Sequence, residues 1–473
     1  MYKKTLVALL SAALLSACTL GPDYKRPGFD LPSLWGKKDA TPAEDKAAKL
    51  PEKWWSVYND PTLDTLVNEA LEHNRDLAAA AARIEQARAN LKITDAERYP
   101  IVTANGNTNR TRASAVGSFP VPANFLETND TRLTLNASWE LDFWGKYRRM
   151  SEAARANLLA SEAGRESVLL GLTSDVVKAY YTLLSLRGQE DAARKTLDTR
   201  KQFVELQQKR FDAGVASELD LRQTEADRDA AQVQLISLVN QREAEDARMA
   251  VLLGRSPRDV WEKRMDEVSK QLAGNGPMVV PAGLPSDLLE RRPDLRQAEQ
   301  TLVAMNASIG AAKANYFPDI SLTGYLGTES TQFSKLFTGP ARIFQYAAAF
   351  SQPIWSAGSV SAQVNYATGQ QKEALANYEK AVQSAFADVR TALAAYTAAR
   401  ETAETQTRRT ESLDKAYKLA RMRYDNGVAS LLDVLDAERN LLGAELSRID
   451  ALAAQRNAVA DLVKALGGGW PAT

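Results

Sequence analysis

The 473-residue chain is poor in the residues on which most enzymes depend, with one histidine, His73, and one cysteine, Cys18. A single cysteine forms neither an internal disulfide nor a CxxC site, and a single histidine excludes a histidine-rich zinc site. A Ser-His-Asp triad would have to use His73, which lies among Glu72, Asn74 and Arg75 as expected of a solvated side chain. The composition therefore disfavours an enzyme, and it predicts no metal site and no bound cofactor.

The chain also lacks an excess of charge and a long apolar run. Its 59 Lys+Arg balance its 59 Asp+Glu, whereas a nucleic-acid binder needs basic residues to offset phosphate. After the N-terminal segment no apolar run reaches about eighteen residues, so no membrane-spanning helix is predicted. The apolar segment 5–17 has only about thirteen residues, which makes 1–17 a predicted signal peptide.

The signal peptide ends in Leu15-Ser16-Ala17-Cys18, which resembles a bacterial lipobox, where the cysteine becomes the acylated N-terminus. Acyl chains would hold that end of the chain at a membrane surface. Cys18 is thus the predicted lipidation site. An aspartate at position 19 would retain such a lipoprotein in the inner membrane, so Thr19 favours the outer membrane.

An internal repeat divides the chain. Segment 210–217, RFDAGVAS, recurs as 423–430, RYDNGVAS, at an offset of 213 residues. Pro100 likewise matches Pro318 at an offset of 218 residues. Agreement of this extent predicts two structural copies.

Two gaps in the distribution of proline indicate very long helices. Proline costs about 3 kcal/mol inside a helix, and it is absent between Pro122 and Pro257 and again after Pro353 as far as Pro471. The gaps are rich in helix formers. They predict long helices at 146–212 and 359–425 and return helices at 218–253 and 431–466, with further helices near 62–98 and 286–315.

Short segments between the helices alternate between apolar and polar residues, as strands with one apolar face do. They lie at 102–107, 132–143, 320–326 and 344–351, and turn-rich loops join them into hairpins at 101–143 and 319–354. Strands of this length cross a bilayer when tilted, although a soluble sheet packed on helices has the same pattern. In lipid the strands must form a closed barrel. Four are too few, so chains must pool them, and periodicity alone does not choose two chains over three.

Motifs of one family run from residue 15 to residue 470. They are Leu15-Ser16-Ala17-Cys18, Gly21-Pro22-Asp23-Tyr24-Lys25-Arg26-Pro27, Trp139-Glu140-Leu141-Asp142-Phe143-Trp144-Gly145, Gly214-Val215-Ala216-Ser217, Leu284-Pro285-Ser286-Asp287-Leu288-Leu289-Glu290-Arg291-Arg292-Pro293-Asp294, Ala307-Ser308-Ile309-Gly310-Ala311-Ala312 and Lys464-Ala465-Leu466-Gly467-Gly468-Gly469-Trp470. With these motifs the chain resembles the TolC-like outer-membrane efflux factor family, in the lipoprotein branch that serves RND-type tripartite pumps.

The resemblance implies a mainly α fold with a membrane β-barrel part. Three chains, each giving four strands, would form a twelve-stranded barrel continued by a periplasmic α-helical barrel with a mixed equatorial region. Such a homotrimer in the outer membrane of a Gram-negative bacterium would passively export drugs or other small molecules. An inner-membrane RND-type transporter would hand them over through a periplasmic adaptor (membrane fusion) protein.

The resemblance also assigns roles to the helix turns. The residues expected to contact the adaptor are Arg210, Gly214, Val215, Ala216, Ser217, Arg423, Tyr424, Gly427, Val428, Ala429 and Ser430. Leu432, Asp436 and Arg439 share one helix face by their spacing, and they are expected to line a periplasmic gate that opens as helices untwist. Spacing alone favours a solvated helix face with an Asp436–Arg439 pair. The glycines and serines of the turns are expected to cap the helices as well as to contact the adaptor.

The predicted organisation follows these boundaries: signal peptide 1–17, lipidated segment 18–61, first repeat 62–257, equatorial linker 258–285, second repeat 286–466 and tail 467–473. Three alternatives stay open. The exit duct could carry metal ions or secreted protein, although seven methionines and one histidine offer few soft ligands. The chain could be a coiled-coil periplasmic lipoprotein without a pore, or, as a more distant alternative, a cell-wall hydrolase.

Overall fold

The computed structural model describes residues 19–32, 51–117, 121–265, 268 and 288–469. The predicted signal peptide and Cys18 lie outside the described residues. The chain divides into two compact units. Unit 1 comprises Met1–Gly28, Arg83–Glu162 and Gln297–Glu379, and unit 2 comprises Phe29–Ala82, Ala163–Arg296 and Lys380–Thr473.

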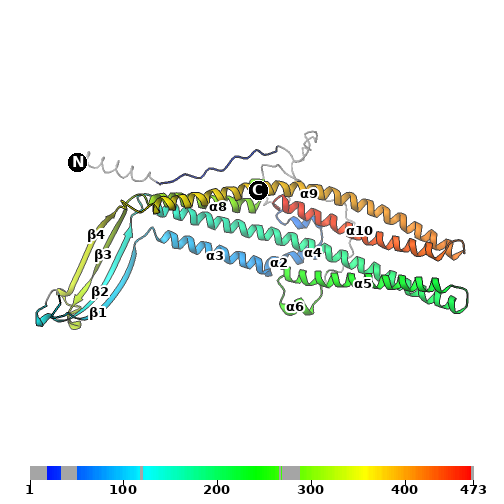
Figure 1. Cartoon of the computed structure of the whole chain (residues 1–473), viewed down its shortest axis with the longest axis horizontal. Coiled ribbons are helices and arrows are strands. Elements are labelled where there is room, and N and C mark those ends of the chain that lie inside the picture. Colours follow the sequence, from blue (N-terminus) through cyan, green and yellow to red (C-terminus); the bar gives the residue numbers. More distant parts are fainter. Residues whose placement is uncertain (1–18, 33–50, 118–120, 266–267, 269–287, 470–473) are drawn as a thin grey trace. The chain divides into compact units, whose positions relative to one another are not determined.

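Unit 1 contains one antiparallel sheet of four strands in the order β1-β2-β3-β4. The strands are β1 (Ile101–Arg112), β2 (Glu127–Glu140), β3 (Asp319–Ser330) and β4 (Arg342–Ser351). Figure 1 shows the two hairpins joined through β2 and β3, which are far apart in the sequence. Among the described residues, the outer edges of β1 and β4 pair with no further strand.

The predicted alternation of apolar and polar residues places two different faces on this sheet. Leu135 lies opposite Leu326, which lies opposite Phe344, and these side chains are 49%, 61% and 75% exposed. The other face is polar: the guanidinium carbon of Arg132 lies 4.5 Å from the ring centre of Tyr325. The sheet therefore has an apolar face that the described part of the chain leaves exposed.

The second strand ends earlier than predicted, at Glu140 instead of 143. The Asp142 carboxylate accepts hydrogen bonds from the backbone N–H groups of Tyr147 (3.2 Å) and Arg148 (2.9 Å), so it caps the next helix. Gly145, at a φ of +76°, turns the corner between the two elements.

The long helices have the predicted ranges. They are α4 (Lys146–Asp212) and α9 (Ser359–Asp425), followed by α5 (Glu218–Leu252) and α10 (Leu431–Ala465). The two return helices end one residue before the predicted positions. No helix in the described part of the chain combines the length and the apolar character needed to cross a membrane.

Both flanking helices are broken where a single helix was predicted. Residues 62–98 form α2 (Pro61–His73) and α3 (Arg75–Ala96), because the side chain of Asn74 accepts hydrogen bonds from the N–H groups of Asp76 and Leu77 and caps α3. Residues 286–315 contain α7 (Leu288–Arg291) and α8 (Pro293–Ala314), since the residue before a proline avoids the helical conformation. The predicted linker begins with a short helix, α6 (Pro257–Glu262).

The main apolar core lies in unit 2. It gathers Trp54 from the 3-10 helix η1 (Trp54–Tyr58), Leu63 from α2, Tyr180 from α4 and Met249 from α5, all at most 2% exposed. Burial of such side chains stabilises a fold by roughly 1.5–3 kcal/mol each. This core fixes the positions of α4, α5 and α10 within unit 2.

Candidate gate and docking site at the helix turns

Two tight turns of the same construction connect α4 to α5 and α9 to α10. Gly214 and Gly427 adopt φ values of +73° and +72°, the left-handed conformation that ends helices and suits glycine. Ser217 and Ser430 then begin the return helices, each in a capping box with the aspartate three residues on. The predicted roles of these glycines and serines in capping are confirmed.

The structure brings two of the predicted docking residues together across the turns. The Tyr424 hydroxyl accepts hydrogen bonds from Arg210 Nη1 (2.7 Å) and Gln207 Nε2 (3.0 Å). Val215 and Val428 instead project from the two turns, 74% and 62% exposed. The turns therefore combine a polar contact between them with two exposed apolar tips.

An apolar cluster lies beside this polar contact. Phe203 of α4 packs with Leu431 and Leu435 of α10, and its ring centre lies 6.1 Å from that of Tyr424. Sequence reasoning missed Phe203 and Gln207. The signal was available, since residues 203, 207 and 210 are spaced to share one helix face.

The three predicted gate residues lie on one exposed face of α10. Leu432, Asp436 and Arg439 are all more than half exposed, whereas Leu431 and Leu435 on the neighbouring face are buried. Arg439 Nη1 lies 3.6 Å from Asp436 Oδ1. An exposed pair of this kind contributes a few tenths of a kcal/mol, about 0.3–0.5, so it constrains the carboxylate only weakly.

A buried charged layer lies further along the same helices, and the sequence did not reveal it. Arg200 of α4 is 4% exposed, and its Nε lies 3.1 Å from Asp227 Oδ2 of α5. On α10, burial raises the pKa of Glu438, Asp227 raises it further, and the positive charges of Arg200 and Arg421 oppose the rise. Three helices besides α10 thus contribute charges that act on this carboxyl group.

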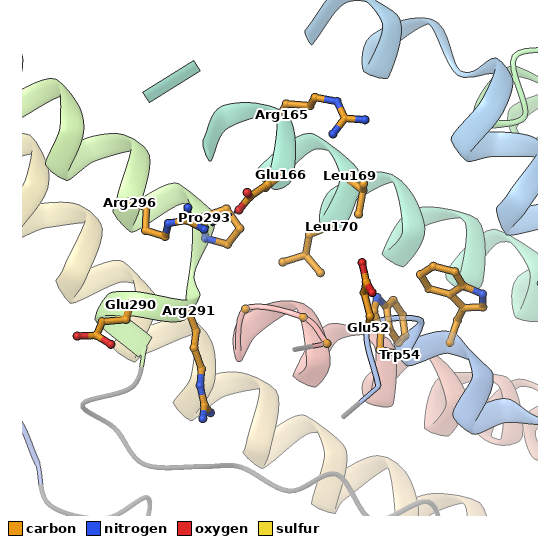
Figure 2. Close-up of a pocket in the computed structure, with 14 residues that line it drawn as sticks. Glu52, Trp54, Arg165, Glu166, Leu169, Leu170, Glu290, Arg291, Pro293 and Arg296 are labelled. Carbon is orange, nitrogen blue, oxygen red and sulfur yellow. Dashed lines mark hydrogen bonds and ion pairs between the residues drawn. The ribbon is translucent and has the colours of Figure 1, made fainter. Parts of the chain in front are cut away.

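Unit 2 also has a pocket of about 500 Å³, shown in Figure 2. Its lining includes the apolar residues Trp54, Leu169 and Leu170, and in the figure Arg296 points toward Glu166, with which it forms an ion pair of 2.7 Å. The described lining contains no serine, cysteine, histidine or lysine. In the part of the chain that the structure describes, no group of carboxylate, histidine or cysteine side chains is arranged to hold a metal ion.

Comparisons with known proteins agree over nearly the whole chain. The family model for outer membrane efflux proteins matches residues 66–255 and 284–468. The antibiotic efflux pump outer membrane protein ArpC of Pseudomonas putida is 36% identical over 99% of this chain and 96% of its own length. The cation efflux system protein CusC of Escherichia coli is 32% identical over 97% of both chains.

Among solved structures, the outer membrane channel CmeC of Campylobacter jejuni superposes with a TM-score of 0.91, at 27% identity and 96% coverage of both chains. The predicted function and location are therefore confirmed: the chain is an efflux channel of the outer membrane. With a family model that matches more than half of its length, it belongs to the outer membrane efflux protein family.

Proposed function

We propose that the chain assembles into a homotrimer that forms the exit duct of a tripartite efflux pump. The observation that carries this proposal is the four-stranded sheet, with exposed apolar residues on one face and two outer edges that pair with no other described strand. Unpaired backbone groups are not tolerated in lipid, so the edges must be closed by other strands. Three chains would supply twelve strands, enough to surround an aqueous lumen.

Helix α5 supports an assembly of several chains. Val233 and Ile236 are 67% and 58% exposed on one side of this helix, and exposed apolar patches of folded proteins commonly mark interfaces. The same succession of a long helix, a turn and a return helix occurs twice in the chain, which supports a quasi-repeated ring of helices in the trimer.

Reconstitution in planar lipid bilayers tests the pore. The purified full-length protein should give discrete channel currents, and native mass spectrometry in detergent should give the mass of three chains. A monomer that produces no currents in bilayers would contradict the proposal and favour the alternative of a coiled-coil lipoprotein without a pore.

The turns are the proposed docking surface for a periplasmic adaptor, and the Leu432, Asp436 and Arg439 face is the proposed gate. In support of docking, the exposed valines of both turns offer apolar anchors. In support of a gate, only the second copy carries an acid and a base at these positions. Its first-copy counterparts are Gln223 and Ala226. Opening would then be a shift between two packings of the helices, biased by adaptor contacts.

We propose drugs or other small organic molecules as the cargo. Relatives differ in this respect, since the name of ArpC refers to antibiotics and that of CusC to cations. In the described residues no group of histidine, cysteine and carboxylate side chains is arranged to hold a metal ion, and the whole chain has only seven methionines. Deleting the gene should sensitise cells to organic antibiotics more than to copper or silver salts, and the reverse order would favour the metal-ion alternative.

Lipidation of Cys18 is also proposed. Replacing it in the variant Cys18→Ser should abolish the incorporation of radiolabelled palmitate, whereas continued incorporation would refute the assignment.

A further inference from the structure

The segment that follows Cys18 is docked on unit 1 along its length. Backbone groups of its first residues are held in place: Leu20 N–H donates to the carbonyl of Trp144 (3.3 Å), the Leu20 carbonyl accepts from Arg149 Nε (3.0 Å), and the Pro22 carbonyl accepts from Asn306 Nδ2 (2.8 Å). We call residues 19–26 the strap.

Two glycines allow the strap to approach α8 closely. A Cβ atom on Gly21, which has a φ of +98°, would lie 2.4 Å from the Cα of Gly310, and a Cβ on Gly310 would lie 2.5 Å from the Leu20 carbonyl oxygen. Both distances are far below van der Waals contact, so neither position accepts a side chain without movement of the backbone. The strap and α8 are thus in direct backbone contact.

The far end of the strap is clamped by one buried carboxylate. Arg26 donates to Glu299 from Nε (2.6 Å) and Nη2 (2.7 Å), and the Tyr24 hydroxyl donates to the same side chain (3.0 Å). The Glu299 side chain is only 7% exposed, and bidentate arginine–carboxylate pairs are among the strongest hydrogen-bonded contacts in proteins. Burial, together with Glu299, raises the pKa of Tyr24, so this hydroxyl stays protonated as a donor.

A second arginine links the strap to α4. The Arg149 side chain is 5% exposed, and its Nη2 lies 2.7 Å from Asp23 Oδ1. Its Cγ atom would lie 2.9 Å from a Cβ on Gly310, so it passes between the strap and α8. The residue 213 positions later, at the start of α9, is Ala362. Alanine cannot make these bonds, so the second copy has no equivalent of the Arg149 contact.

We propose that Glu299 is an internal docking site whose occupant is the strap, and that the docked strap ties α4 to α8 and fixes the N-terminus of the mature chain on unit 1. Docking begins at Thr19, whose Cα would lie 3.2 Å from a Cβ on Gly145, so a lipid on Cys18 would be attached one peptide bond from the docked part. This consequence for the membrane anchor rests on the proposed lipidation, whereas the docking itself does not.

Limited trypsin digestion of the full-length protein tests the proposal. Trypsin cleaves after Lys25 only if the strap leaves its site, and the Arg26–Pro27 bond is resistant. The variants Glu299→Gln and Arg26→Met should each be cut after Lys25 at least tenfold faster than the wild type, and the double variant no faster than either. The control Glu162→Gln, which alters the looser 3.9 Å pair with Arg88 in the same unit, should be cut at the wild-type rate.

Three results would overturn the proposal: single variants cut at the wild-type rate, a double variant in which the two effects multiply, or wild-type cleavage as fast as that of a free peptide. Unchanged circular dichroism and an intact C-terminal fragment show that the variants are folded. Mass spectrometry of the released fragment reports lipid on Cys18 separately. An unmodified fragment with the expected cleavage pattern would refute lipidation of Cys18 and support docking of the strap. A lipidated fragment released at equal rates from all variants would support lipidation and refute docking.

Discussion

Helices α5 and α10 are counterparts in the two halves of the chain, but their surroundings differ. Both begin in a serine–aspartate capping box after a left-handed glycine. On α5, Val233 and Ile236 are more than half exposed. Their counterparts on α10, Leu446 and Ile449, are partly buried.

Contacts within unit 2 explain the difference. Leu446 packs against the cluster that includes Leu186 and Leu197 of α4, and Ile449 lies over Gly188, where a Cβ would approach its Cγ2 atom to 3.3 Å. The apolar face of α10 is thus covered by the chain itself, whereas the same face of α5 remains open. The same succession of elements therefore has two environments: the chain itself covers α10, whereas α5 keeps an open face that a neighbouring chain of the proposed trimer would cover.

The largest effect is expected from a charge placed on the open face of α5. The variant Val233→Glu should abolish the proposed trimer, since a carboxylate buried at an interface without a partner costs several kcal/mol, equivalent to more than about a hundredfold in the assembly constant. Native mass spectrometry in detergent at graded protein concentrations measures the loss.

A charge on another side of the same helical turn provides the control. Gln234 is also exposed but points about 100° away from Val233, so Gln234→Glu should assemble normally. The matching change on α10, Leu446→Glu, should lower the stability of the chain itself. A trimer that survives Val233→Glu would show that α5 faces solvent, and it would remove the contrast between the two helices.

The contrast in burial could not be read from the sequence, although much of the fold could. Proline gaps and helix-forming residues predict α4 and α9 to their observed ends, because such effects act within a few residues. The break at Asn74 was missed because its amide also donates to the Leu252 carbonyl (2.9 Å), a partner far away in the chain. Which apolar face is covered depends in the same way on long-range packing.

In the candidate site, too, local patterns could be predicted from the sequence and burial could not. The spacing of Leu432, Asp436 and Arg439 predicts a shared face, and the structure has it. The layer of Arg200 and Asp227 was missed, since charged residues in a helical pattern resemble a solvated surface until other helices cover them. Sequence patterns thus report local geometry, and burial of polar groups requires the tertiary structure.

The next effect in size concerns the contact between the two turns. The variant Tyr424→Phe keeps the ring beside Phe203 but removes the acceptor for Arg210 and Gln207. A hydrogen bond of this kind is worth about 1 kcal/mol, so amide hydrogen exchange near residues 424–436 should accelerate about fivefold. The control Tyr366→Phe removes a hydroxyl near the start of the same helix, where it accepts from Gln370 (3.2 Å), and it should leave exchange in the turn unchanged. Equal acceleration in both variants would contradict a specific link between the turns.

A smaller effect is expected from the acid that only the second half carries. The variant Asp436→Ala should raise single-channel conductance in planar bilayers. It removes the 3.6 Å pair with Arg439, which stabilises the closed packing by about 0.5 kcal/mol, so the expected rise is about twofold. It should also weaken block by divalent cations, which a ring of carboxylates attracts. The counterpart variant Gln223→Ala should change neither property. Unchanged conductance and unchanged block in Asp436→Ala would remove the gate assignment.

The smallest effect, a change of less than about twofold in exchange rate, is expected from the pH dependence of Glu438. Because burial raises the pKa of this carboxyl group in the folded chain, folding favours its neutral form. The resulting stabilisation is complete below the unfolded pKa of about 4.3 and is lost as the pH rises through the raised folded value. Around Glu438, Arg200 and Arg421 oppose this shift and Asp227 adds to it, which keeps the net effect small.

Hydrogen exchange of α10 between pH 4 and pH 8, corrected for the intrinsic rates, measures this change. Protection should decline with rising pH in the wild type and stay constant in Glu438→Gln, which remains neutral throughout. Its counterpart in the first half, Glu225, pairs with Arg222 at 2.9 Å on an exposed surface, so Glu225→Gln should keep the wild-type pH dependence of α10. If Glu438→Gln keeps it too, the acid response originates elsewhere, and Glu438 and its counterpart Glu225 differ in burial but not in their effect on the pH dependence of α10.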